Sequence, residues 1–374
     1  MSAGAGFRPP AYPYDQLAEL RAKADRLEGG VVDLSVGTPC DPPPASVVGP
    51  ALACLDRAGP YPASVGSPGL RQAAADWMRR RLGVEVDPDH VAACVGTKEF
   101  VGTLPAWLRR RHPSRDTVLY PAVSYPTYEM GALVAGCRAV PVPVGADGAL
   151  CLDQVPESEA ERALALWVNS PSNPTGRLDD LAAAASWGRE RGVPVFSDEC
   201  YVEFTWVGPR RSVLQSGSSG VVAVHSLSKR SNMAGMRVGF YAGDPELVGY
   251  LSEVRKHVGM MVPGPVQEAA RLALEDDAHV EEQRRRYHQR IELFCAVLGA
   301  AGLEAVPPEG GFYLWVEAPQ GDWALADRLA LEAGVLVSPG SFFGREGAGH
   351  VRAAMVQPTG RLELAARRLG VAPG

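Results

Sequence analysis

The sequence lacks any hydrophobic run that approaches the roughly 20 residues needed to cross a bilayer. Its first ten residues also lack the charged and apolar regions of a secretory signal peptide. We therefore expect no membrane segment and a cytoplasmic protein.

Metal-binding and disulfide patterns are missing as well. The seven cysteines form no C-x-x-C pair, and their odd number in a chain of 374 residues fits reduced thiols. The seven histidines are scattered and form no H-E-x-x-H motif. We therefore expect no metal site.

The chain also lacks a large basic block. Its net charge is −6, and the largest cluster of basic residues is Arg109 to Arg111, which argues against nucleic acid as a partner. No internal repeat is present, so a repeat architecture is excluded. With 46% hydrophobic and 21% charged residues, the chain is an ordinary globular protein that is long enough for a large and a smaller domain.

What the sequence does contain is an alternation of apolar runs and amphipathic stretches. Most of the expected strands are continuous apolar runs, so they should be buried on both faces. Helices between them imply parallel crossovers, hence an α/β fold with an open, mostly parallel sheet whose ligands bind beyond the carboxyl ends of the strands. Strands are expected at 91–95, 117–120, 139–144, 164–169, 193–197, 221–225 and 238–242, and helices at 99–109, 126–135 and 178–191.

The two ends of the chain read differently. The residues before 45 predict an extended arm at 1–15, lying on a partner subunit or partly disordered, and then a helix and a short strand. After Pro245 the pattern becomes helical, with smaller α+β elements that suggest a second domain. We therefore predict a large domain at 45–275, and an N-terminal arm and small domain at 1–44 and 276–374. The expected elements of the second domain are helices at 16–27, 275–298 and 323–333 and strands at 31–35, 335–338 and 351–356.

Polar residues follow four of the expected strands at the point where each strand ends. Each of them has a structural alternative, since it could belong to a turn, to the start of a helix or to the core. A coincidence at four strand ends is harder to explain in that way, so the pattern predicts a ligand site at one rim of the sheet. The residues are Tyr125, Asn169 with N-P-T-G at 173–176, Asp198 with Tyr201, and Ser226 with Lys229.

The reactive groups are concentrated in V-H-S-L-S-K and the arginine that follows it. Nearby cationic charge lowers the pKa of a lysine, and the free amine of Lys229 could form a Schiff base with an aldehyde. The hydroxyls of Ser226 and Ser228 and the guanidinium of Arg237 would suit a phosphate. An aldehyde that also carries a phosphate is pyridoxal 5′-phosphate, so these residues predict that cofactor.

Three further positions are ambiguous by themselves. The turn Gly96, Thr97, Lys98 enters a helix whose N-terminus could hold a phosphate, although such turns also occur without a ligand. Gly37 ends a strand, where a residue without Cβ lets the backbone approach a ligand, and a simple turn is the alternative. Tyr61 lies in a turn-rich loop, where a tyrosine is usually structural.

Together these motifs resemble the class I and II aminotransferases of the fold-type I pyridoxal-phosphate enzymes, over nearly the whole chain. The matching motifs, in the family's order, are G-T-K, S-Y-P-T-Y, N-P-T-G, D-E-C-Y, S-L-S-K, R-V-G-F and R-A-A-M. Passages such as V-D-L-S-V-G-T-P-C-D-P-P-P and H-S-L-S-K-R-S-N-M-A-G-M-R resemble the actinobacterial type of N-succinyldiaminopimelate aminotransferase. Met236 departs from that subfamily, which usually has an aromatic or other large residue there.

The resemblance implies roles around the cofactor ring. Lys229 would hold the cofactor as a Schiff base and move the substrate proton. Asp198 would pair with the ring nitrogen, and Tyr125 would stack on the ring face. Asn173 and Tyr201 would donate hydrogen bonds to the phenolic oxygen.

It also implies roles at the two anionic ends of the site. Gly37, Asn173 and Arg352 would form the site for the substrate α-carboxylate. Tyr61 would reach across a homodimer interface to the phosphate in the partner's site. The residues that would bind the phosphate within the subunit are Gly96, Thr97, Lys98, Ser226, Ser228 and Arg237.

The implied reaction is amino transfer between N-succinyl-LL-2,6-diaminopimelate and 2-oxoglutarate in lysine biosynthesis. Aminotransferases for aspartate, aromatic or other common amino acids are alternatives, and so is a carbon–sulfur lyase that uses the same cofactor. A transcription regulator is set aside, because too short a stretch precedes Gly37 for a DNA-binding region. Candidates for binding the distal end of the substrate are Lys98, Glu99 and Arg230.

Overall fold

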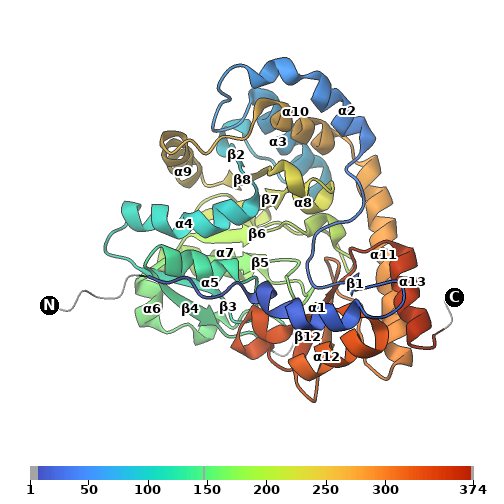
Figure 1. Ribbon diagram of the computed structural model, residues 1–374. Helices are drawn as coiled ribbons and strands as arrows, with labels where there is room; N and C mark the ends of the chain where they lie inside the picture. The colour runs from blue at the N-terminus through green and yellow to red at the C-terminus, as the bar shows by residue number, and fades with distance from the viewer. Residues whose placement is uncertain (1–6, 146–147, 372–374) are drawn as a thin grey trace.

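The computed structural model describes residues 7–145 and 148–371 (Figure 1). It contains a seven-stranded, a three-stranded and a two-stranded sheet. Within the described residues, no helix has the length and apolarity to span a membrane, and no three potential metal ligands lie together.

The seven-stranded sheet is the frame of the molecule. Its order is β2-β8-β7-β6-β5-β3-β4, and every strand except β8 runs in the same direction. The central strands are buried along their whole length, as their continuous apolar runs predict. The strands are β2 (Val91–Cys94), β3 (Thr117–Pro121), β4 (Arg138–Val142), β5 (Ala163–Asn169), β6 (Val195–Asp198), β7 (Val221–Ser226) and β8 (Gly239–Gly243).

The antiparallel direction of β8 was not predicted from the alternation of strands and helices. The connection from β7 to β8 contains only the four-residue helix α8 (Leu227–Arg230) and a 3-10 turn at Ala234–Met236. A parallel crossover usually carries a helix long enough to cover the sheet, and this connection has none. The chain therefore returns along β7 as an antiparallel neighbour.

Helices cover both faces of this sheet (Figure 1). A separate buried cluster lies on each face, which explains why most strands have no polar side. The short helix α6 (Glu157–Glu161) precedes β5. One cluster contains residues of α2 (Ala45–Ala53), α3 (Pro68–Leu82), α7 (Leu181–Arg191) and α10 (Gly264–Glu275), and the other contains residues of α4 (Thr97–Arg111), α5 (Thr127–Val134) and α9 (Pro245–His257).

Local sequence signals set the ends of these helices. Ser67 caps α3, since its hydroxyl accepts a hydrogen bond from the Leu70 N–H at 3.2 Å, and Gly83 ends the helix in the left-handed region at φ 65°. Asp180 caps α7 in the same way, accepting from the Ala183 N–H at 2.9 Å.

The smaller sheets lie near the ends of the chain. β11 (Ser338–Pro339), β12 (His350–Ala354) and β9 (Tyr313–Glu317) form the antiparallel three-stranded sheet, and β1 (Val32–Asp33) pairs in parallel with β10 (Val335–Leu336). A third buried cluster surrounds them. The helices of this part are α1 (Ala18–Ala24), α11 (Ala278–Ala300), α12 (Asp322–Ala333) and α13 (Thr359–Arg368).

Three elements here differ from expectation. The strand expected at 335–338 is divided into β10 and β11, which belong to different sheets. β9 was not predicted as a strand. The helix expected at 275–298 begins at Ala278, because Asp276 and Asp277 separate α10 from α11 and the Asp276 carboxylate accepts a hydrogen bond from the Ala278 N–H at 2.9 Å. The division into 45–275 and the two ends stays a prediction, and Tyr201 of the predicted large domain packs into the third cluster.

Candidate active site

A cavity of about 470 Å³ opens where strands β5, β6 and β7 end. Most of the predicted site residues line it, although they come from distant parts of the chain. Gly96 lies against Arg237, one of the lining residues. The predicted residues that line the cavity are Gly37, Thr97, Lys98, Tyr125, Asn173, Asp198, Tyr201, Ser226, Ser228, Lys229, Arg237 and Arg352.

Lys229 lies on α8 at the end of β7, and its ammonium donates a hydrogen bond to the carbonyl oxygen of Gly37. Burial lowers the pKa of Lys229 to about 8, and the positive charges of Arg352 and Arg237 act in the same direction. The lowered pKa makes the free amine, which is the nucleophilic form, more accessible near neutral pH than it is for an ordinary lysine.

The end of the cavity next to α4 is built for an anion. A Cβ on Gly96 would lie 2.3 Å from Nη2 of Arg237, so only glycine lets the guanidinium approach the start of this 15-residue helix. The hydroxyl of Ser226 accepts a hydrogen bond from the Ser228 N–H at 3.1 Å. Free helix N–H groups, hydroxyls and a guanidinium suit a doubly charged phosphate.

Asp198 is the carboxylate that lines the cavity, and it is 6% exposed. Burial raises its pKa, although hydrogen bonds from the Tyr128 hydroxyl at 2.9 Å and the Cys200 N–H at 3.1 Å favour the ionised form. A protonated ring nitrogen is the partner that would compensate such a buried charge. Aldehyde, phosphate and ring nitrogen thus each meet suitable groups, so the cavity fits pyridoxal 5′-phosphate.

Tyr128 was missed, because its place in S-Y-P-T-Y predicts only a helix residue. Tyr313 was missed as well, and it explains Gly37: a Cβ on Gly37 would lie 2.1 Å from the Tyr313 hydroxyl oxygen. The same hydroxyl lies 2.8 Å from that of Tyr201. Glycine is thus required at position 37 by a close approach, but the group that approaches is a protein side chain.

Arg352 lies on β12 and is 2% exposed. Its Nη1 donates to Oδ1 of Asn173 at 2.8 Å, and its Nη2 donates to the carbonyl oxygen of Ser35. The guanidinium lies 4.4 Å from the ring centroid of Tyr313 and 4.5 Å from that of Phe343. Two rings and two hydrogen-bond acceptors therefore fix a planar fork that can bind a carboxylate.

Part of the N-terminal segment contacts the cavity, while the expected packing of the arm on a partner subunit stays a prediction. Residues 1–6 lie outside the described part of the chain, but Tyr12 and Tyr14 line the cavity of their own subunit. The Tyr14 hydroxyl accepts a hydrogen bond from Arg352 at 3.3 Å, and its ring packs on Phe342. Nothing in the Gly-, Pro- and Tyr-rich sequence separates such a contact from a loose terminus.

Two of the three candidates for the distal end of the substrate are wrong. Glu99 accepts hydrogen bonds from Arg255 at 2.8 and 2.6 Å, and Arg230 is 3% exposed in a separate ion-pair network. Lys98 does line the cavity and forms no hydrogen bond or ion pair with any described residue, while its Nζ lies 5.3 Å from the Tyr12 ring centroid.

Tyr61 is 96% exposed and does not line this cavity. Its role in a partner's site therefore stays a prediction, as does the homodimer. A monomeric holoenzyme in sedimentation experiments at assay concentration would refute both.

The known proteins to which this chain is similar are aminotransferases. A family model described as aminotransferase class I and II matches residues 29–369. The chain is 43% identical to the 4-dedimethylamino-4-oxo-anhydrotetracycline transaminase OxyQ of Streptomyces rimosus (96% of this chain, 99% of that protein), and 36% identical to an LL-diaminopimelate aminotransferase of Aquifex aeolicus (96% of each). A double mutant of the Thermus thermophilus aspartate aminotransferase superposes with a TM-score of 0.86 at 28% identity (97% of this chain, 96% of that chain).

Proposed function

This chain belongs to the class I and II aminotransferases, which depend on pyridoxal phosphate, and on that premise we propose that it transfers the amino group of N-succinyl-LL-2,6-diaminopimelate to 2-oxoglutarate. Enzymes of this family act on an amino acid and a 2-oxo acid. The proposed reaction belongs to diaminopimelate and lysine biosynthesis.

The charge balance of the cavity carries the proposal. Cationic side chains outnumber the single lining carboxylate, Asp198. Arg237 serves the cofactor phosphate, Arg352 serves the substrate α-carboxylate, and Lys229 is the reactive amine. Lys98 lies in the first turn of α4, so its N–H could serve the phosphate while its side chain is left for a second anionic group. Glutamate, 2-oxoglutarate and the N-succinyl donor each carry a second carboxylate, which supports this choice of substrates.

The chain's own residues divide the chemistry. When bound, the cofactor supplies an aldehyde and an electron-withdrawing ring. Asp198, oriented by Tyr128 and by the Cys200 N–H, keeps the ring nitrogen protonated. Arg352 holds the α-carboxylate of each substrate in turn, and Nζ of Lys229 would move a proton between the substrate Cα and the aldehyde carbon of the cofactor.

Other donors are supported by the relatives' names. The Aquifex relative is named for LL-diaminopimelate itself, and OxyQ for amino transfer to a tetracycline precursor. LL-diaminopimelate carries a carboxylate and an ammonium at its distal end, whereas the succinylated donor carries two carboxylates and no ammonium there. For that reason, Lys98 favours the succinylated substrate.

A panel of half-reactions tests the donor. The holoenzyme is mixed with N-succinyl-LL-diaminopimelate, LL-diaminopimelate, glutamate, aspartate and an aromatic amino acid, and the loss of its visible absorption band is followed for each. We expect the succinylated donor and glutamate to react with kcat/KM at least about tenfold above the others, equivalent to about 1.4 kcal/mol. A faster reaction of any other donor would contradict the proposed substrate but not the family. Pyruvate or thiol released from cystathionine would indicate lyase activity.

Lys98→Met should raise KM for 2-oxoglutarate by about 10- to 100-fold, because the loss of one charge-assisted hydrogen bond costs about 1.5–3 kcal/mol. KM for pyruvate, which has no second carboxylate, should stay unchanged. Steady-state kinetics with the two acceptors measure the difference. Lys256→Met, which removes an exposed lysine paired with Glu253, is the matched control. Equal effects on both acceptors would remove Lys98 from the distal site.

A further inference from the structure

We propose that Glu203 and Arg230 are positioning residues for the reaction, which hold the helix that carries Lys229 in place from outside the cavity. Neither side chain lines the cavity. The inference uses the reaction class alone and does not depend on the identity of the amino donor.

Helix α8 cannot fix its own position, because it has only four residues. The residues after it include Asn232 and Arg237 with positive φ, so the following backbone is irregular. A small cavity lies directly behind α8, lined by Leu227 and Arg230 among others. Leu227 packs into the buried apolar cluster, but apolar packing cannot compensate the buried charge of Arg230, so a polar interaction must hold this side of α8.

Arg230 supplies that interaction. It follows Lys229 in the chain and is 3% exposed. Its Nε donates to Glu203 at 3.2 Å, and its Nη2 donates to Asp277 at 3.2 Å. Its Nη1 donates to the carbonyl oxygen of Ala273 and to the Ser231 hydroxyl, the latter at 3.1 Å. The guanidinium thus joins α8 to the end of α10 and the start of α11.

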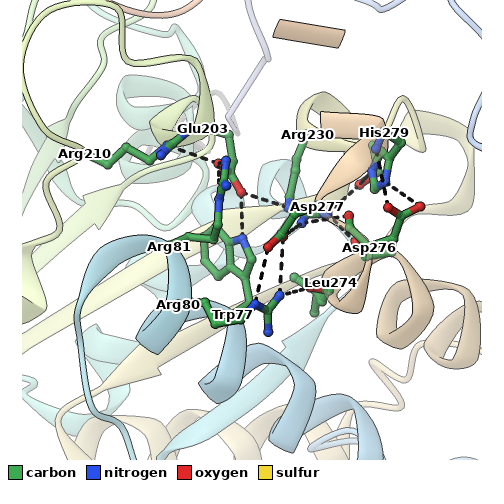
Figure 2. A network of polar contacts seen from close by, with 12 residues as sticks. Trp77, Arg80, Arg81, Glu203, Arg210, Arg230, Leu274, Asp276, Asp277 and His279 are labelled. Atoms are coloured by element: carbon green, nitrogen blue, oxygen red, sulfur yellow. Dashed lines mark hydrogen bonds and ion pairs between the residues drawn. The ribbon is translucent and has the colours of Figure 1, made fainter. Parts of the chain in front are cut away.

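Glu203 is the central anion of this network (Figure 2). Its carboxylate accepts hydrogen bonds from Trp77 at 2.7 Å and from Arg81 at 2.9 and 3.1 Å, and Nε of Arg210 lies 3.2 Å away. Burial alone would raise the pKa of Glu203, but Arg230 and Arg81 outweigh burial and lower that pKa to about 2. The carboxylate therefore stays ionised at working pH.

The position of Glu203 connects two groups of the active site. Glu203 lies in the 3-10 turn Val202–Phe204, two residues after Tyr201. Tyr201 lines the cavity. The Glu203 carboxylate accepts a hydrogen bond from Arg230, which directly follows Lys229 in the chain. Glu203 therefore ties the segment after β6 to the segment after β7. A displaced network would move the lysine amine without changing any group that touches the cofactor or the substrate.

The test uses Glu203→Gln, which keeps the shape without the charge, and Arg230→Lys, which keeps the charge without the planar fork. Displacing a reacting group by about 1 Å can lower a rate about 100-fold, so we expect kcat with the fastest donor of the panel to fall about 10- to 100-fold. KM should stay within about twofold, because Arg352 is unaffected. The pH midpoint of the holoenzyme's visible band should rise, since a loosened lysine is better solvated.

Arg80→Gln is the matched control. Arg80 bonds the Leu274 carbonyl oxygen at 2.8 Å and Asp277 at 3.3 Å but touches neither Glu203 nor Arg230, so kcat and the midpoint should match wild type. If Glu203→Gln fails to fold, kcat and the pH midpoint of Arg230→Lys test the proposal. The proposal would be overturned if a variant kept the wild-type pH midpoint and lost activity only in proportion to its unfolded fraction. The network would then have a structural role only. The midpoint needs no substrate, so a wrong donor would not affect it.

Discussion

Lys229→Ala should lower kcat by at least roughly 1,000-fold, because it removes both the covalent handle for the cofactor and the proton carrier of the substrate Cα. The amine lines the cavity with a pKa lowered to about 8, and the variant lacks a base at the position from which that proton would be moved. Steady-state transamination measures the loss. Borohydride reduction followed by peptide mass mapping measures the covalent attachment, which should disappear in the variant.

The mapping is unambiguous, because the whole chain contains only four lysines, at positions 23, 98, 229 and 256. Lys256→Ala is the control, since that side chain is 60% exposed and is paired with Glu253. It should keep both the activity and the adduct. An adduct mapped to Lys98 in the wild-type enzyme would refute the assignment of Lys229.

Arg352→Ala should lower kcat/KM for both the amino donor and the 2-oxo acid by about 100- to 10,000-fold. The guanidinium would form two charge-assisted hydrogen bonds to the α-carboxylate, each contributing about 1.5–3 kcal/mol, and about 1.4 kcal/mol corresponds to tenfold. Most of the change should appear in KM, because both substrates bind through the same carboxylate. The KM of each substrate, measured at saturating concentrations of the other, tests this directly.

Two further variants test the interpretation of the Arg352→Ala result. Arg352→Lys keeps the charge but loses the fork, so it should recover only part of the affinity. Arg345→Ala removes an exposed arginine on a neighbouring turn and should leave both KM values unchanged. A rise in KM for one substrate alone would mean that Arg352 does not bind the group that the two substrates share.

Most strands of the seven-stranded sheet could be predicted from the sequence, because each one is marked by a local run of apolar residues. Continuous apolar runs such as those of β5 and β7 are buried on both faces whatever lies elsewhere in the chain. Tyr125, Asp198 and Lys229 were predicted to share one rim because each follows a strand, and they line one cavity. Tyr313 was missed for the opposite reason: its contact with Tyr201 joins residues 112 positions apart, and only the packing of β9 next to the cavity brings them together.

The role of Arg230 could not be predicted from its neighbours in the sequence. A charged residue next to Lys229 suggests a role toward the substrate. Consecutive residues of a helix point about 100° apart, however, so Arg230 faces away from the cavity that Lys229 lines. Its partners Glu203 and Asp277 are distant in sequence, and no local pattern marks them as ligands of an arginine.

The backbone of residues 35–37 has a consequence for how such an enzyme could acquire new substrates. The carbonyl oxygen of Ser35 binds Arg352, and that of Gly37 binds Lys229. The intervening Val36 and the nearby Tyr14 present side chains to the cavity. Main-chain atoms of this segment therefore bind Lys229 and Arg352, while the side chain of Val36 faces the cavity without forming any of these hydrogen bonds. Exchanging that side chain between related enzymes could redirect donor preference and preserve the catalytic machinery.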